Sequence, residues 1–195
     1  NKSGQAKRES VVKFFSGNFG GEKSRLRTNL KLIGTAASVE NNEIIFGNQM
    51  QKFDTMTSIV TTSEISKGKS HTHGLFSGKS SAVIKGQVLV EKGAEKADVY
   101  LSQHSILLTK DARANTIPCL EIKEENVSRA THSTSVSQID EEHIFYLTSR
   151  GISEIDARKL ITLGFLEKLI RNIKNKRLQE EVSQIAEEKF GEENA

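Results

Sequence analysis

The sequence has few of the residues that crosslink or interrupt small folds. Its 195 residues include one cysteine, one proline and no tryptophan. One cysteine excludes an intramolecular disulfide and a four-cysteine zinc site, and it fits a reducing compartment such as the cytoplasm. No apolar run approaches the roughly 18 residues that a membrane span needs, and no signal peptide opens the chain. We therefore expect a cytoplasmic protein with no membrane contact.

A strong charge of either sign is also missing. The chain has 28 Lys and Arg against 25 Asp and Glu, and it has no arginine-rich tract, which argues against nucleic-acid binding. The charge is uneven, because residues 1–139 carry 19 basic and 13 acidic side chains, whereas residues 140–195 carry 9 and 12. This split predicts two units. Since the first residue is Asn rather than Met, we expect residues 1–139 to be the C-terminal part of a longer core.

Short runs of alternating apolar and polar residues fill the region from Arg25 to Ile139, as in NLKLIG and ADVYLSQHSILLT. An alternation of period two is typical of strands with one buried face. Polar or charged stretches such as ENNE, SKGKS and KEEN are expected to separate the strands. No helical period is present between Gly20 and Val136, which argues against a doubly wound α/β sheet.

Three later segments repeat one pattern, from a charged turn through small residues into a strand: EKGAEKADVYLSQ, TKDARANTIPCLEI and KEENVSRATHSTSV. Their spacing of roughly 15 to 18 residues is typical of a solenoid in which each coil stacks on the last. We predict a right-handed parallel β-helix, and an antiparallel sandwich remains the alternative. The last coil of a solenoid exposes unpaired backbone groups, which a helical unit can cover or another chain can pair with.

The rear of the sequence, residues 140–195, predicts three helices. Asp140 is a suitable N-cap for the first, and Gly151 is expected to follow its end. Ser153 with Asp156 resembles a capping box for a second helix over about 154–173. A third, highly charged helix is expected over about 176–190.

Apolar residues recur every three or four positions along the second helix, with Leu163 and Leu166 off the main stripe. Such helices either pack as a small bundle on the end of the solenoid or dock a partner. The residues that we assign to partner docking are Ile155, Leu160, Phe165, Leu166, Leu169 and Ile173.

Motifs for catalysis and metal binding are weak. In HGLFSGKSS, His73 stands where a phosphate-binding loop requires glycine, and the following AVIKGQVLV is strand-like. His71 and His73 could share a metal, but no third ligand has suitable spacing, and a polar loop is the simpler interpretation. We therefore expect no catalytic residue.

Two residues remain as candidate ligands for iron or sulfur chemistry. His132 lies among small hydroxyl residues, where an imidazole is a poor core filler, although an ordinary surface histidine remains an alternative. Cys119 lies in the apolar run IPCLEI, where a free cysteine is more often a small buried hydrophobe. Both side chains are soft or borderline ligands.

The runs IPCLEI, THSTSVSQIDEEHIFYLTSRGIS and DARKLITLGFL strongly resemble the C-terminal half of the SufB/SufD family of iron–sulfur cluster assembly scaffolds. The resemblance implies a right-handed parallel β-helix followed by helices that bind the SufC ATPase. It also implies a dimer, formed through the end of the β-helix with a SufB/SufD paralogue or a second copy. The histidine of the family motif corresponds to His132, which the resemblance places near a nascent cluster at the dimer interface.

The sequence departs from SufB in two places and is closer to SufD. Where SufB proteins carry a functional cysteine before the threonine-rich strand, Arg113 and Ala114 stand here. SufB also flanks the histidine with glutamates, where this chain has Thr131 and Ser133. Cys119 is not at the SufB position, so that role is not transferred to it.

The ligand count limits what the chain can hold alone. A stable iron–sulfur cluster needs about four ligands, mostly thiolates. One cysteine and one histidine cannot supply them, so we expect a transient cluster shared between subunits. The leading hypothesis is a non-catalytic scaffold, and the alternative is a β-helical protein that acts on or binds a polysaccharide or other polymer, which would need acidic residues converging in a groove.

Overall fold

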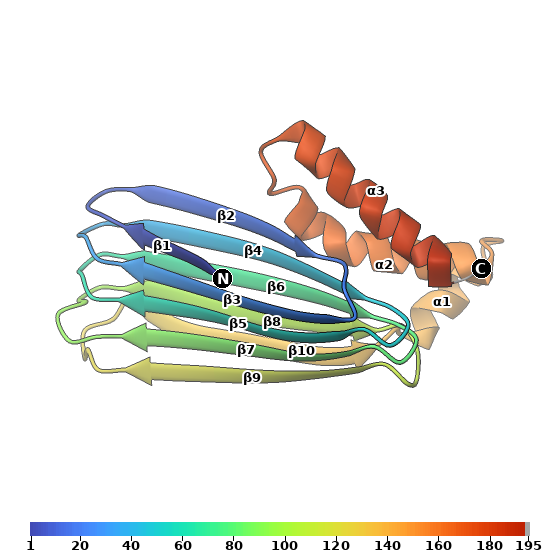
Figure 1. The fold of residues 1–195 in the computed structure, drawn as a ribbon, viewed down its shortest axis with the longest axis horizontal. Helices are drawn as coiled ribbons and strands as arrows, with labels where there is room; N and C mark the ends of the chain where they lie inside the picture. Colours follow the sequence, from blue (N-terminus) through green and yellow to red (C-terminus); the bar gives the residue numbers. More distant parts are fainter. Residues whose placement is uncertain (194–195) are drawn as a thin grey trace.

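Ten parallel strands coil into a solenoid, and three helices follow it (Figure 1). The computed structural model describes residues 1–193, so the last two residues of the predicted helical unit 140–195 lie outside the described part. The strands are β1 Lys2–Ala6, β2 Val11–Asn18, β3 Lys23–Leu32, β4 Ser38–Gly47, β5 Lys52–Thr61, β6 Lys67–Phe76, β7 Ser81–Val90, β8 Asp98–Leu107, β9 Arg113–Ile122 and β10 Arg129–Gln138. The helices are α1 Glu141–Thr148, α2 Glu154–Ile170 and α3 Lys176–Glu193.

The strands form two sheets, one of odd-numbered and one of even-numbered strands, each in the order of the chain. All strand pairs in residues 1–193 are parallel, which confirms the predicted parallel β-solenoid and excludes the antiparallel sandwich. Consecutive strands belong to opposite sheets and do not pair. Each coil therefore consists of two strands and two turns.

The predicted repeat length is half of a coil. Lys23 pairs with Lys52, and Lys52 pairs with Ser81, so each of these coils takes 29 residues, whereas the step from Ser81 to Arg113 takes 32. The spacing of 15 to 18 residues in the sequence corresponds to one strand and its turn. The strands of both sheets have the same apolar–polar alternation, since both face the shared interior. The sequence pattern therefore repeats with every strand and does not show that two strands make one coil.

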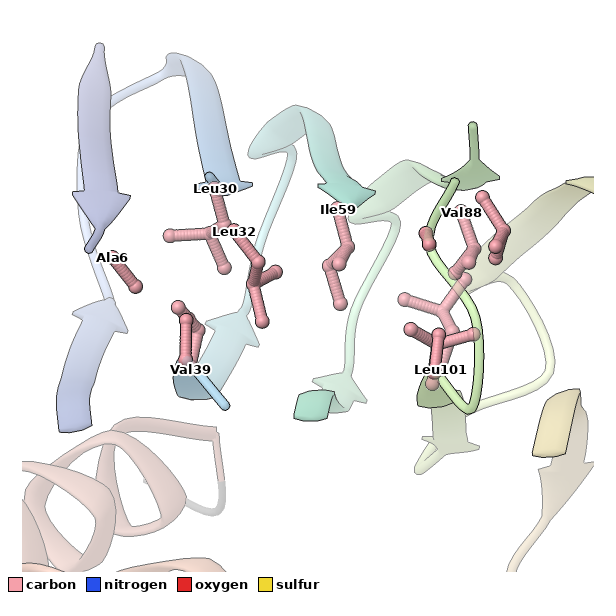
Figure 2. Close-up of a cluster of buried hydrophobic side chains, with 12 residues drawn as sticks. Ala6, Leu30, Leu32, Val39, Ile59, Val88 and Leu101 are labelled. Carbon is pink, nitrogen blue, oxygen red and sulfur yellow. The ribbon is translucent and has the colours of Figure 1, made fainter. Parts of the chain in front are cut away.

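The interior is apolar at both ends of the strands, with buried polar side chains between the two apolar clusters. Leu30, Ile59 and Val88 follow one another on successive odd strands, while Val39 and Leu101 face them from the even sheet (Figure 2). Each of these five side chains is at most 1% exposed. Stacking like residues at matching register positions buries each side chain between its neighbours, so β-branched and leucine side chains stabilise the coil without a thick core.

Two polar stretches that were predicted to separate strands lie inside strands instead. ENNE belongs to β4 and most of SKGKS to β6. Asn41 and Glu43 face the interior and are at most 1% exposed, and Asn41 donates from Nδ2 to Ser70 Oγ over 3.0 Å. The sequence prediction failed here because a parallel coil can stack polar side chains in its interior, where they bond to one another.

The helix starts follow the sequence prediction. Asp140 caps α1 by accepting from the backbone N–H of Glu142, and Ser153 caps α2 by accepting from that of Asp156. Gly151 adopts the left-handed conformation with φ +86° after α1. The second helix ends at Ile170, earlier than predicted, and the third extends to Glu193. None of the helices in residues 1–193 is both long and apolar enough to cross a membrane.

Candidate functional site

The last rung of the solenoid, formed by β9 and β10, has two open strand edges. Among the described strands, β9 pairs only with β7 and β10 only with β8, and each strand has ten residues. At the other end, β1 has five residues and β2 has eight. The final rung therefore offers the longer pair of unpaired backbone edges, the feature through which sheets extend into another chain.

His132 lies on β10 at the inner face of this rung. Its register partner on β8 is Leu101, which is fully buried inside the coil. In parallel pairing, register partners point to the same side of the sheet, so His132 occupies an interior position. It is nevertheless exposed, because no described strand covers β10.

The opposite wall of this opening comes from β9. On the preceding rung, a Cβ added to Gly86 would lie 2.3 Å from Leu101 Cδ2 and 2.9 Å from Gln103 Nε2, so these residues meet across the coil. One rung later, Pro118 takes the place of Gly86, and His132 and Thr134 take those of Leu101 and Gln103. The imidazole of His132 is therefore positioned at the mouth of the solenoid.

Cys119 is not part of the same surface. It is exposed, contrary to the expectation of a buried hydrophobe. Its register partner is Gln87, between the buried positions Gly86 and Val88, so Cys119 belongs to the outward-facing set of β9. The two predicted ligands thus lie on different sheets, one on the inner and one on the outer face.

The donor set does not fit an iron–sulfur cluster held by this chain alone. Within residues 1–193, no three His, Cys, Asp or Glu side chains are grouped so that they could hold a metal ion. A cluster of about four ligands would need further donors from another chain or from small thiols.

Three other histidines lie on the outer face of the even sheet, close to α2. His73 stacks on Phe165 with ring centroids 4.4 Å apart, and its Nδ1–H donates to the Phe165 carbonyl over 2.9 Å. His104 lies edge-on to His73 at 6.0 Å, and its Nδ1 is 2.7 Å from Ser135 Oγ. His71 lies 2.8 Å from Ser102 Oγ. The predicted polar loop around His71 and His73 is part of β6, and these rings join strands and a helix.

Burial controls the charge of these histidines. It lowers the pKa of His73 to about 4, with the Phe165 carbonyl partly opposing the shift. Burial also lowers the pKa of His71 and of His104. The neutral form of His73 is therefore the one that supports α2 at neutral pH.

Helices α2 and α3 lie against the outer face of the even sheet at one end of its strands (Figure 1). Leu166, Leu169 and Ile170 pack against Ile44, Phe46 and Leu75 of the sheet. Lys189 of α3 donates from Nζ to the Phe46 carbonyl over 3.0 Å. The helical unit is thus tied to the solenoid by apolar packing and by a buried ammonium group.

The six predicted docking residues divide into two groups. Leu166, Leu169 and Ile173 are buried within the chain, and Phe165 is half-buried against His73. Ile155 and Leu160 are 57% and 54% exposed. Leu166, which the sequence placed off the main apolar stripe of the helix, is the most deeply buried of the six. The sheet, and not a partner, covers that face of α2.

Two further exposed apolar residues were absent from the sequence prediction. Phe145 is 73% exposed and Tyr146 53% exposed, both on α1. The signal was the four-residue apolar run IFYL, since a helix can turn only Ile144 and Leu147 toward the same neighbour. With Ile155 and Leu160 they are four exposed apolar side chains on α1 and α2, a set that we name the helical apolar face.

The profile of the family described as "SUF system FeS cluster assembly, SufBD core domain" matches residues 1–165. The chain belongs to the SufBD family. It is 29% identical over 192 residues to the iron–sulfur cluster assembly protein SufD of Bacillus subtilis, a match that covers 97% of this chain and 43% of that protein. It is 30% identical over 170 residues to SufD of Escherichia coli, covering 86% and 40%.

The chain spans less than half the length of these two SufD proteins. A SufBD family protein of Galdieria sulphuraria is 30% identical over 142 residues, which covers 73% of this chain and 64% of that protein. The SufBD membership confirms the family resemblance. The polysaccharide-active β-helix, the alternative from the sequence, gains no support from any of these matches.

Proposed function

We propose that this SufBD chain is a non-catalytic, SufD-like scaffold subunit that supports assembly and transfer of iron–sulfur clusters in the cytoplasm. The observation that carries the proposal is the interior position of His132 on an uncovered rung. A side chain at an interior position of the last rung becomes buried only when another surface packs on that rung. A SufB/SufD paralogue or a second copy, stacking on β9 and β10, would provide that cover.

In this arrangement His132 would face the partner subunit and could offer one nitrogen ligand to a nascent cluster. The remaining ligands would come from the partner or from small thiols, because the inner positions of β9 and β10 carry no other His, Cys, Asp or Glu. Cys119 would contribute only if the partner wrapped around the outer face of β9. A shared and incomplete ligand set suits a scaffold, since it favours release of the cluster.

Replacing His132 by Ala should lower the iron and sulfide recovered with the complex purified from cells. His132→Ala removes only an exposed ring, so the thermal unfolding midpoint should stay unchanged. His143→Ala is the matched control, because His143 is also exposed and lies on α1. Equal cluster content in wild type and His132→Ala would remove His132 from the site.

The helical apolar face is the proposed docking surface for the SufC ATPase subunit. Its four exposed side chains lie on α1 and α2, directly after the open rung in the chain. Docking there would place a nucleotide-driven motor next to the dimer interface. The buried residues Leu166, Leu169 and Ile173 would then support α2 without touching the ATPase.

The test is a pair of charge insertions. Ile155→Glu with Leu160→Glu should weaken binding to purified SufC about tenfold or more, since carboxylates would have to be desolvated in an apolar contact. Val11→Glu with Ile33→Glu is the control, because both residues are exposed and lie in the solenoid. Equal SufC affinity for the helical variant and the wild type would contradict the docking assignment.

A further inference from the structure

A row of cations follows one corner of the solenoid, where even strands turn into odd strands. Lys23 and Lys52 are register partners on β3 and β5, and Arg113 occupies the same position on β9. Lys79 and Lys110 lie in the turns before β7 and β9. All five side chains are exposed. We name these five residues the basic corner.

The stacking of the turns aligns these charges. The backbone N–H of Lys79 donates to the Gln49 carbonyl of the turn below, and Thr109 Oγ1 donates to the Gly78 carbonyl. Neighbouring parallel strands lie about 4.8 Å apart, so the corner from β3 to β9 is about 14 Å long. Within the described chain, none of the five cations forms an ion pair within 4.0 Å.

Nearby anions do not neutralise the corner. Glu22 and Asp111 are exposed in the same turns, and Glu141 lines a small pocket together with Lys110 and Arg158. Farther along β3, Arg25 and Arg27 surround Asp54 together with Lys85. Cations thus clearly outnumber carboxylates on this side of the odd sheet, which α2 and α3 leave uncovered (Figure 1).

Like charges at adjacent register positions destabilise a sheet. Lys23 and Lys52 are such neighbours, and their charges repel each other. An uncharged polar residue would fit equally well at either exposed position without this repulsion. On β7 this register position is Ser81, and Lys79 in the preceding turn supplies the charge of that rung, so each rung from β3 to β9 carries a cation facing the same corner. Long lysine side chains can adjust to a line of negative charges without fixing its register.

We propose that the basic corner docks an extended acidic segment of a partner protein. A strand presents every second side chain on one face at about 6.8 Å, so two or three carboxylates would span the corner. A nucleic acid fits less well, since the corner has one arginine and no aromatic ring among its residues for bases to stack on. The argument for the basic corner does not depend on the proposed SufC surface, which lies on α1 and α2.

The test measures binding of a fluorescent peptide of alternating Glu and Ser to the full 195-residue chain. At about 0.15 M ionic strength, Lys52→Glu with Lys79→Glu should weaken binding about tenfold, because attraction is lost and repulsion gained at two sites. The control is Lys7→Glu with Lys92→Glu, which alters two exposed turn lysines at the opposite ends of the strands and changes the net charge equally. The control should bind as the wild type does.

Three results would overturn the proposal. The first is equal weakening in both double variants, which would show a response to net charge alone. The second is no measurable peptide binding by the wild type at this ionic strength. The third is tighter binding of a single-stranded oligonucleotide of matched charge, lost in Lys52→Glu with Lys79→Glu, which would assign the corner to nucleic acid.

Discussion

At the scale of single residues, the buried carboxyl of Glu43 is the most unusual group in the solenoid. It is 1% exposed, and its Oε2 accepts a long hydrogen bond of 3.5 Å from Thr57 Oγ1. Burial raises the pKa of Glu43 to about 7, and the charge of Lys2 opposes the shift only in part. Burial in turn lowers the pKa of Lys2. Glu43 is therefore only partly ionised near neutral pH.

The sign of the resulting pH dependence follows from proton binding. Because Glu43 keeps its proton in the folded state up to a pKa of about 7, its stabilising contribution is complete below the unfolded value of 4.5. That contribution is lost as the pH rises through 7. Glu43→Gln should therefore be more stable than the wild type at about pH 8, by on the order of 3 kcal/mol or less, and similar to it at about pH 4.

Urea unfolding at both pH values measures this difference. Glu64→Gln is the control, because Glu64 is exposed in a turn and its replacement should change neither value. From pH 4 to pH 8 the free energy of unfolding of the wild type should decrease more than that of Glu43→Gln. An equal decrease in both proteins would contradict the prediction.

At the scale of elements, the turns are packed as closely as the strands. Gly34, between β3 and β4, faces the backbone of the turn below, where an added Cβ would lie 2.0 Å from Arg8 N. Since this neighbour is backbone, it cannot move aside as a side chain could. The coils are therefore held at a fixed separation at their corners as well as along the sheets.

Gly34→Ala should lower the free energy of unfolding by about 1–3 kcal/mol, the usual effect of overpacking. Gly20→Ala is the matched control, because nothing lies within 4 Å of a Cβ at Gly20, which is also in a turn. The control should be neutral or slightly stabilising. Chemical denaturation measures the free energy of unfolding of both variants. Equal values for the two would show that the turns can separate.

At the scale of the whole molecule, the open rung decides how the chain associates in the proposed scaffold. Val136 lies on β10 at an inner position two residues after Thr134, and it is 38% exposed. Val136→Lys would insert a charge where a second subunit is proposed to stack. It should weaken dimer formation with a SufBD paralogue about tenfold or more, without unfolding the chain.

Val11→Lys provides the comparison, because Val11 is 67% exposed on β2, at the other end of the solenoid. Sedimentation velocity of mixtures with the paralogue would separate monomers from dimers. If Val11→Lys disrupts the dimer and Val136→Lys does not, the subunits meet at the β1–β2 end instead.

The sequence by itself determined the class of each half and several local features. Period-two alternation predicted the strands because one face of every strand is buried, and the Asp140 and Ser153 caps fixed the helix starts because capping depends only on residues within one turn. Residue order could not reveal that two strands make one coil, or that Glu43 and Asn41 lie inside. Both depend on which strands become neighbours.

Only the tertiary structure decided which predicted site residues are available. It placed Leu166, Leu169 and Ile173 against the sheet, because α2 folds back on the solenoid, and it left Ile155 and Leu160 exposed. It put His132 on the inner and Cys119 on the outer face, since the facing of each depends on strand pairing. Sequence periodicity records that a side chain has an apolar or polar neighbour, whereas packing across the coil determines which neighbour that is.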